Sequence, residues 1–258
     1  MIKSASSVEF PEIEKPEPEM RENKIIDLPS PNFGSRAANT PIDMLVVHYT
    51  GMVDAQSALK RLSDPVAKVS AHYCIDEGGT IYQLVGEEKR AWHAGISYWR
   101  GETDVNSRSL GIELVNPGHD HGYRAFPTAQ MESLIGLSSQ ILARHPIPKR
   151  NVVGHSDIAP SRKQDPGELF DWQALASEGI GLWPSPLSET THAPCNPDIM
   201  LADYGYETTA TDSGTVSARA GTHSVVEAFQ RHFRPSKIDG VMDEQSTRLL
   251  MTLLEVVA

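Results

Sequence analysis

Three side chains able to bind a metal ion lie at the ends of apolar strands or in ordered loops. His48 lies in VVHYT, His155 in VVGHSDIAP and Asp165 in RKQDPG. A catalytic zinc ion takes three protein ligands and leaves a fourth position open for water. Two neutral imidazoles and one carboxylate leave such a site positively charged, which lowers the pKa of water there toward about 7. These residue types therefore permit a zinc-dependent hydrolase.

The same three residues also have a purely structural interpretation. A histidine at the end of a strand can simply be hydrogen-bonded to its surroundings, and an aspartate is a common turn or capping residue. Asp165-Pro166-Gly167 is consistent with an ordinary turn, but it is equally suited to hold the carboxylate rigidly toward the strand ends.

A fourth candidate, Glu113, lies in the middle of the apolar run SLGIELVN. A carboxylate inside a buried strand needs an explanation, because burial without a partner is costly. One explanation is a functional carboxyl group whose pKa is raised by burial. The other is structural, with Glu113 paired to Arg108 or Lys163.

The segments around these residues alternate between strand and helix patterns. Apolar runs predict strands at 44–49, 109–116 and 151–155, and a Glu-Gly-Gly turn between 72–76 and 80–85 predicts a β-hairpin. Residues 55–62 and 128–144 have helical character, the second with a clear 3.6-residue apolar spacing. We therefore expect an interleaved α/β domain over residues 25–183.

The two flanks of this domain differ from it in composition. Residues 1–24 are rich in Glu and Pro and predict a flexible tail, and the Pro-, Ser- and Thr-rich stretch 184–197 predicts a linker. A second, smaller unit is expected over 198–258. It has helical spacing at 198–204, 222–233 and 244–257, with a polar loop at 210–221. The three helices predict a small bundle.

Composition narrows the class of protein further. The 258 residues carry a formal net charge of -11, which argues against nucleic acid as a partner. The two cysteines, Cys74 and Cys195, are far apart, so we expect no disulfide framework. No run approaches the ~20 apolar residues of a transmembrane helix. The start of the chain lacks the apolar run of a secretory signal, so a cytoplasmic location is expected, with the periplasm as the alternative.

The stretch from His48 to Trp172 resembles the zinc-dependent N-acetylmuramoyl-L-alanine amidases of the AmpD and AmiD type. The motifs VVHYT, SAHYCID, RAWHAG, NSRSLGIEL and GHSDIAPSRKQDPG occur in the family order. The resemblance implies a mixed central β-sheet flanked by helices, with Zn²⁺ bound by His48, His155 and Asp165. It also implies hydrolysis of the amide between N-acetylmuramic acid and L-alanine, in peptidoglycan or in anhydro-muropeptides.

The resemblance further implies a role for each aligned residue. Glu113 would move the proton from the attacking water to the leaving amine, and Lys163 would stabilise the oxyanion. Expected substrate contacts are Trp92, His93, Asn106, Arg162 and Tyr73, with Arg162 suited to a peptide carboxylate and Trp92 equally suited to the core. The other histidines receive no role, and His119-Asp120-His121 is interpreted as a solvated loop.

Two alternatives remain open from the sequence. A recognition protein that binds muropeptides without cutting them is the second candidate, although relatives of that kind typically lack a complete ligand set. The motifs AFQRHFRP and IDGVMDEQST make residues 198–258 resemble a peptidoglycan-binding three-helix module, but a long polar loop and Asp243 depart from its pattern. A unit that merely packs on the catalytic domain is the alternative there.

Overall fold

The computed structural model describes residues 25–184, 196–209 and 221–258. The predicted tail at 1–24 lies outside these residues, as do the predicted linker and polar loop apart from their ends. Cys195 is also outside them, while Cys74 is a buried free thiol. No helix in the described ranges is long and apolar enough to cross a membrane.

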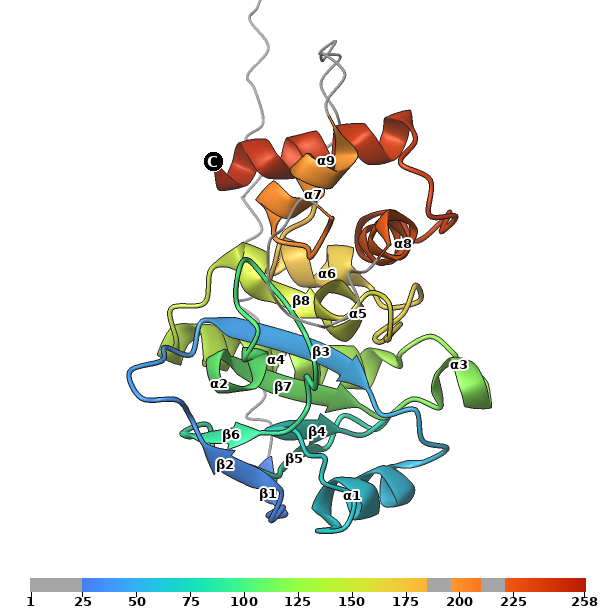
Figure 1. Cartoon of the computed structure of the whole chain (residues 1–258). Coiled ribbons are helices and arrows are strands. Elements are labelled where there is room, and N and C mark those ends of the chain that lie inside the picture. The colour runs from blue at the N-terminus through green and yellow to red at the C-terminus, as the bar shows by residue number, and fades with distance from the viewer. Residues whose placement is uncertain (1–24, 185–195, 210–220) are drawn as a thin grey trace, which may run out of the picture.

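A six-stranded sheet in the order β1-β5-β4-β7-β3-β8 forms the centre of the molecule (Figure 1). Only β4 and β5 pair in antiparallel fashion, so the sheet is mixed, as predicted. A separate antiparallel pair joins β2 and β6. The strands are β1 (Ile25–Asp27), β2 (Phe33–Ser35), β3 (Met44–Tyr49), β4 (Tyr73–Ile75), β5 (Ile81–Gln83), β6 (Lys89–Ala91), β7 (Ser109–Leu114) and β8 (Val152–Gly154).

The helices connect these strands and then continue beyond them. They are α1 (Ala55–Ser63), α2 (Val105–Arg108), α3 (Gly118–His121), α4 (Thr128–Arg144), the 3-10 helix η1 (Lys149–Asn151), α5 (His155–Ile158), α6 (Trp172–Ser177), α7 (Pro197–Tyr204), α8 (Thr222–Phe233) and α9 (Glu244–Val257). The long predicted helices are confirmed. The predicted loop at His119–His121 is instead the short helix α3, whose side chains are exposed.

Successive side chains of the central strands alternate between an apolar face of the sheet and a face that carries polar candidate site residues. Leu45 and Val47 of β3 and Ile112 of β7 belong to a core closed by Leu134 and Leu137 of α4. Because successive residues of a strand point to opposite faces, His48 and Glu113 project from the other face. They are also direct partners in the parallel pairing of β3 with β7. Register alone therefore places an imidazole beside a carboxylate.

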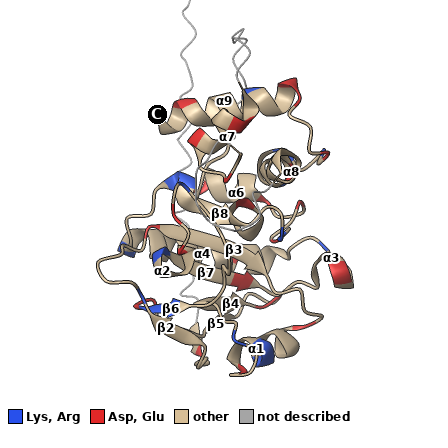
Figure 2. Ribbon diagram, viewed as in Figure 1, with Lys and Arg blue, Asp and Glu red and all other residues tan. Residues whose placement is uncertain are grey.

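The C-terminal helices pack on that second face, toward the β3 and β8 side of the sheet (Figure 1). One apolar cluster contains Val46 and Val153 from the sheet together with Tyr206 and Phe229 from the C-terminal part. The N–H of Arg100 also donates to the carbonyl of Gly205 at 2.8 Å. Figure 2 shows acidic and basic residues spread over both parts of the chain. The two parts share a core, while the domain boundary at 184–197 stays a prediction.

Asp157, in the short helix α5, joins the two parts through a buried carboxylate. It accepts hydrogen bonds from the Gly154 N–H at 2.7 Å, the Tyr206 hydroxyl at 2.7 Å and His232 Nδ1 at 2.8 Å. His232 also stacks on Trp172, with ring centroids 3.8 Å apart. A carboxylate buried in this way is stable only when its oxygens are hydrogen-bonded. The contacts therefore bind the C-terminal helices to the helix that begins at His155.

We predict that Tyr206→Phe lowers the free energy of unfolding by about 1.5–3 kcal/mol, because it removes one donor from a buried carboxylate. Thermal and urea unfolding measure the change. Tyr82→Phe is the matched control, since its hydroxyl donates to Asp76 at 3.3 Å from a partly exposed position, and a loss of no more than about 0.5 kcal/mol is expected there. Equal losses in the two variants would contradict the assigned role of Asp157.

Candidate active site

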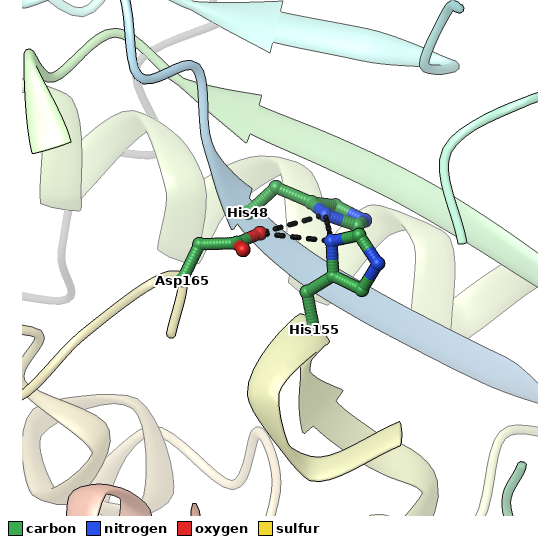
Figure 3. Close-up of side chains that lie close together, drawn as sticks. All are labelled: His48, His155 and Asp165. Carbon is green, nitrogen blue, oxygen red and sulfur yellow. Dashed lines mark hydrogen bonds and ion pairs between the residues drawn. The ribbon is translucent and has the colours of Figure 1, made fainter. Parts of the chain in front are cut away.

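Three ligand atoms converge at the carboxyl ends of two neighbouring parallel strands. His48 lies near the end of β3, His155 directly follows β8, and Asp165 lies in the loop after α5. The two Nδ1 atoms are 2.9 Å apart, and Asp165 Oδ2 lies 3.0 Å from His48 Nδ1 and 3.1 Å from His155 Nδ1 (Figure 3). All three residues are buried. The sequence-predicted ligands therefore come together in one group.

The donor set of this group fits a divalent cation such as zinc. His155 Nε2 lies 3.0 Å from the Ala94 carbonyl, which can only accept, so Nε2 carries the hydrogen and Nδ1 offers a lone pair. A neutral imidazole and a carboxylate facing each other at this distance repel unless a cation lies between them. Zinc–nitrogen distances of about 2.0–2.1 Å in a tetrahedral site place neighbouring ligand atoms roughly 3.3 Å apart, close to the separations here.

Glu113 lies beside this group with one oxygen unsatisfied. Its side chain is buried, and among the described residues Oε2 has no hydrogen-bond partner. Burial raises the pKa of Glu113 well above its usual range, the nearby Asp165 carboxylate raises it further, and Lys163 opposes both. A buried carboxyl group with a raised pKa and a free oxygen is suited to accept and donate protons.

Lys163 and Arg162 come from the same loop as Asp165. Lys163 is half-buried, and its charge lowers the pKa of both Glu113 and His48. Arg162 is exposed and donates through Nη2 to the carbonyls of Ala94 at 3.0 Å and Ile96 at 2.6 Å. Both cations therefore lie at the site, Lys163 beside the carboxyl group and Arg162 at the rim.

The other predicted substrate contacts lie in different surroundings. Trp92 is partly exposed, and its backbone N–H donates to Ser70 Oγ at 2.9 Å. His93 is buried behind His48, with His93 Nδ1 3.0 Å from His48 Nε2. Asn106 is buried too, and its side-chain oxygen accepts two backbone N–H groups. His93 therefore contacts a ligand directly, and Asn106 is connected to the ligands through His93 and Ala94.

Tyr73 is not brought to this group. It is 3% exposed in the core beneath α4, and its hydroxyl donates to Glu87 at 2.8 Å. Glu87 also pairs with Arg144 and His145. Conversely, nothing in the sequence pointed to the Ala94 carbonyl or to Ser109, both of which bond to site histidines. A backbone carbonyl has no signature in a sequence.

Residues 38–168 match the family described as Amidase_2, N-acetylmuramoyl-L-alanine amidase. The chain belongs to this amidase family. AmiD of Escherichia coli is 40% identical over 243 residues, which cover 86% of this chain and 85% of that protein. AmpD of Haemophilus influenzae is 37% identical over 166 residues, covering 57% of this chain and 88% of that protein. The predicted family and the amide-hydrolase activity are confirmed.

Solved structures show the same relationship. The complex of E. coli AmiD with anhydro-N-acetylmuramic acid-L-Ala-D-γ-Glu-L-Lys is 40% identical, with a TM-score of 0.73, and the match covers 86% of this chain and 92% of that one. AmpDh3 of Pseudomonas aeruginosa in complex with anhydromuramic pentapeptide is 33% identical, with a TM-score of 0.73 and coverages of 86% and 95%. The family match ends at residue 168, so the peptidoglycan-binding role of residues 198–258 stays a prediction.

Proposed function

We propose that this amidase is zinc-dependent and cleaves the amide between anhydro-N-acetylmuramic acid and the L-alanine of the stem peptide. The observation that carries the proposal is the convergence of three buried ligand atoms beside a buried carboxyl group. The complexes of AmiD and AmpDh3 with anhydro-muropeptides support this choice of substrate. The complete set of site residues favours hydrolysis over mere recognition.

His48, His155 and Asp165 would hold the zinc ion. When bound, zinc supplies a Lewis acid that polarises the amide carbonyl and lowers the pKa of a water molecule. Two imidazoles and one carboxylate leave the ion a net positive charge, which this chemistry requires. Burial of all three ligands keeps competing water away and strengthens the electrostatic effect.

Glu113 would move the proton. Its free Oε2 accepts a proton from the attacking water as the water oxygen bonds to the lactyl carbonyl carbon. The same oxygen then delivers that proton to the alanine nitrogen as the carbon–nitrogen bond breaks. The second proton of the water stays on the new carboxyl group, so the products are the muramic carboxylic acid and the free amine of the peptide, and passage of that proton to the amine gives the carboxylate and the ammonium group. Lys163 would stabilise the negative charge on the carbonyl oxygen of the tetrahedral intermediate.

Arg162 and Trp92 are proposed to contact the substrate at the rim. Arg162 uses Nη2 to bind two carbonyls, and its remaining N–H groups are suited to a stem-peptide carboxylate. Trp92 is partly exposed and adjacent in sequence to His93, and its ring would offer an apolar surface to the substrate. Tyr73 has no place in this proposal, because its hydroxyl is bound to Glu87.

We expect removal of the metal with a chelator to abolish cleavage of anhydro-muropeptide, and stoichiometric zinc to restore it. Chromatography of the products measures turnover, and atomic absorption measures the bound metal. Addition of zinc to protein that was never treated with chelator serves as the control. Full turnover by metal-free protein would remove the zinc mechanism.

Glu113→Gln is predicted to retain zinc and lose activity by about 10²–10⁴-fold, because the ligands are intact while the proton acceptor is gone. Zinc content and turnover are measured on the same sample. Glu132→Gln makes the same chemical change at an exposed position on α4 and should leave both values unchanged. Loss of zinc from Glu113→Gln would show that this residue helps to bind the metal instead.

The cytoplasmic location expected from the sequence stays a prediction, and a soluble turnover fragment is the substrate that suits it. We therefore expect faster cleavage of purified anhydro-muropeptide than of intact sacculi at equal concentrations of the scissile amide. The same chromatographic assay compares the two. A clear preference for sacculi would contradict the proposed substrate while leaving the amidase chemistry intact.

A further inference from the structure

The segment Trp92-His93-Ala94 lies directly behind both histidine ligands and bonds to each of them. His93 Nδ1 is 3.0 Å from His48 Nε2, and the Ala94 carbonyl is 3.0 Å from His155 Nε2. His93 is buried, and its ring meets that of His48 edge-on with centroids 5.0 Å apart. Each ligand therefore bonds to this segment through the nitrogen opposite the one that faces the metal site.

The hydrogen positions along this chain can be assigned from its far end. The Ser109 hydroxyl donates to the Val105 carbonyl at 2.7 Å, so its oxygen is left to accept from His93 Nε2 at 3.1 Å. A neutral His93 that carries its hydrogen on Nε2 presents a lone pair on Nδ1. That lone pair must accept from His48 Nε2–H. The hydrogen of His48 is thereby held on Nε2, and its Nδ1 is free to bind a cation.

The next residue, Ala94, holds the second ligand, His155, in the same tautomer. Because the Ala94 carbonyl only accepts, it holds the hydrogen of His155 on Nε2 as well. Asn106 fixes the segment itself, since its side-chain oxygen accepts the N–H groups of His93 at 3.1 Å and Ala94 at 2.9 Å. One buried amide thus controls the position of two adjacent residues and, through them, of both imidazoles.

We propose that His93, the Ala94 carbonyl and Asn106 form a positioning unit that fixes the tautomer and orientation of both histidine ligands. In this unit His93 and Asn106 act on the ligands and not on the substrate, which differs from the role expected from the sequence. The proposal rests on the proposed zinc dependence. It concerns how the protein prepares the site before any substrate binds.

Zinc affinity, measured by competition with a chromophoric chelator, tests the unit without reference to turnover. His93→Phe keeps a ring of similar shape but removes the acceptor, and a 10–100-fold weaker affinity is expected. His93→Gln restores a side-chain acceptor and is expected to recover most of the affinity. His72→Gln is the matched control, because His72 is also buried and meets the His93 ring edge-on, with centroids 5.8 Å apart, but it accepts from the Gly111 N–H and bonds to neither ligand. Its zinc affinity should equal that of the unchanged protein.

The second measurement is the tautomeric state of the histidine rings in the metal-free protein, determined by nitrogen-15 NMR. In the unchanged protein, both His48 and His155 are expected as the Nε2–H tautomer. Asn106→Leu should give a mixture of tautomers at both histidines. Asn106→Asp keeps the two accepted hydrogen bonds and should preserve the Nε2–H tautomers. Should His93→Phe fail to fold, Ser109→Ala removes the group that orders His93 and must weaken zinc binding.

Two results would overturn the proposal. The first is an unchanged zinc affinity in folded His93→Phe or in Ser109→Ala, and the second is a His48 that carries its hydrogen on Nδ1. These results differ from a failure of the proposed function, in which the unchanged protein would itself neither bind zinc nor need it. Tight zinc binding by the unchanged protein, together with equally tight binding by the variants, would refute the positioning unit alone.

Discussion

The structure depends on holding three electron-rich atoms within about 3 Å of one another in a buried place. His48 Nδ1, His155 Nδ1 and Asp165 Oδ2 would repel one another in the absence of a cation, and each is withdrawn from water. Such an arrangement is stable only where the surrounding fold fixes it firmly. The parallel neighbours β3 and β8 bring two of the ligands to one sheet edge, and the loop after α5 brings the third.

Because side chains alternate along each strand, one face of the sheet packs into the core and the other holds the candidate site. The face beneath α4 is mainly apolar and supplies the hydrophobic stabilisation, while the opposite face carries His48 and Glu113 as partners in register. The C-terminal helices then cover part of this second face, and Asp157 links them to the helix that starts at His155. A polar site is thus surrounded by apolar packing, which limits the directions in which its ligands can move.

The sequence predicted the long elements well because their patterns repeat. The apolar run of β3 and the helical spacing of α4 and α9 have the predicted bounds. Several short elements were not predicted, because three or four residues are too few to show a repeating hydrophobic pattern. They are the strands β1, β2 and β6 and the one-turn helices α2 and α5.

The same distinction holds within the site. The three candidate ligands could be identified because a metal site demands those side chains, and the structure brings them together. The surroundings of His93 and Tyr73 could not, because they depend on contacts with a histidine, a serine hydroxyl and a glutamate from other segments of the chain. The role of His232 could not be predicted either, because 75 residues separate it from Asp157, whose carboxylate it binds. Side-chain identity defines the ligands, whereas three-dimensional pairing defines what orients them.

The Ala94 carbonyl connects the centre of the site to its rim. One oxygen accepts from His155 Nε2 at 3.0 Å and from Arg162 Nη2 at 3.0 Å, and a carbonyl has two lone pairs to offer. A ligand to the metal and a candidate contact to the substrate therefore share one acceptor. Any displacement of Arg162 by a bound carboxylate changes the charge next to the hydrogen bond that orients His155. If His155 binds the metal and Arg162 the substrate, as proposed, both events act on a common backbone segment, and substitutions at the two residues are expected to be non-additive.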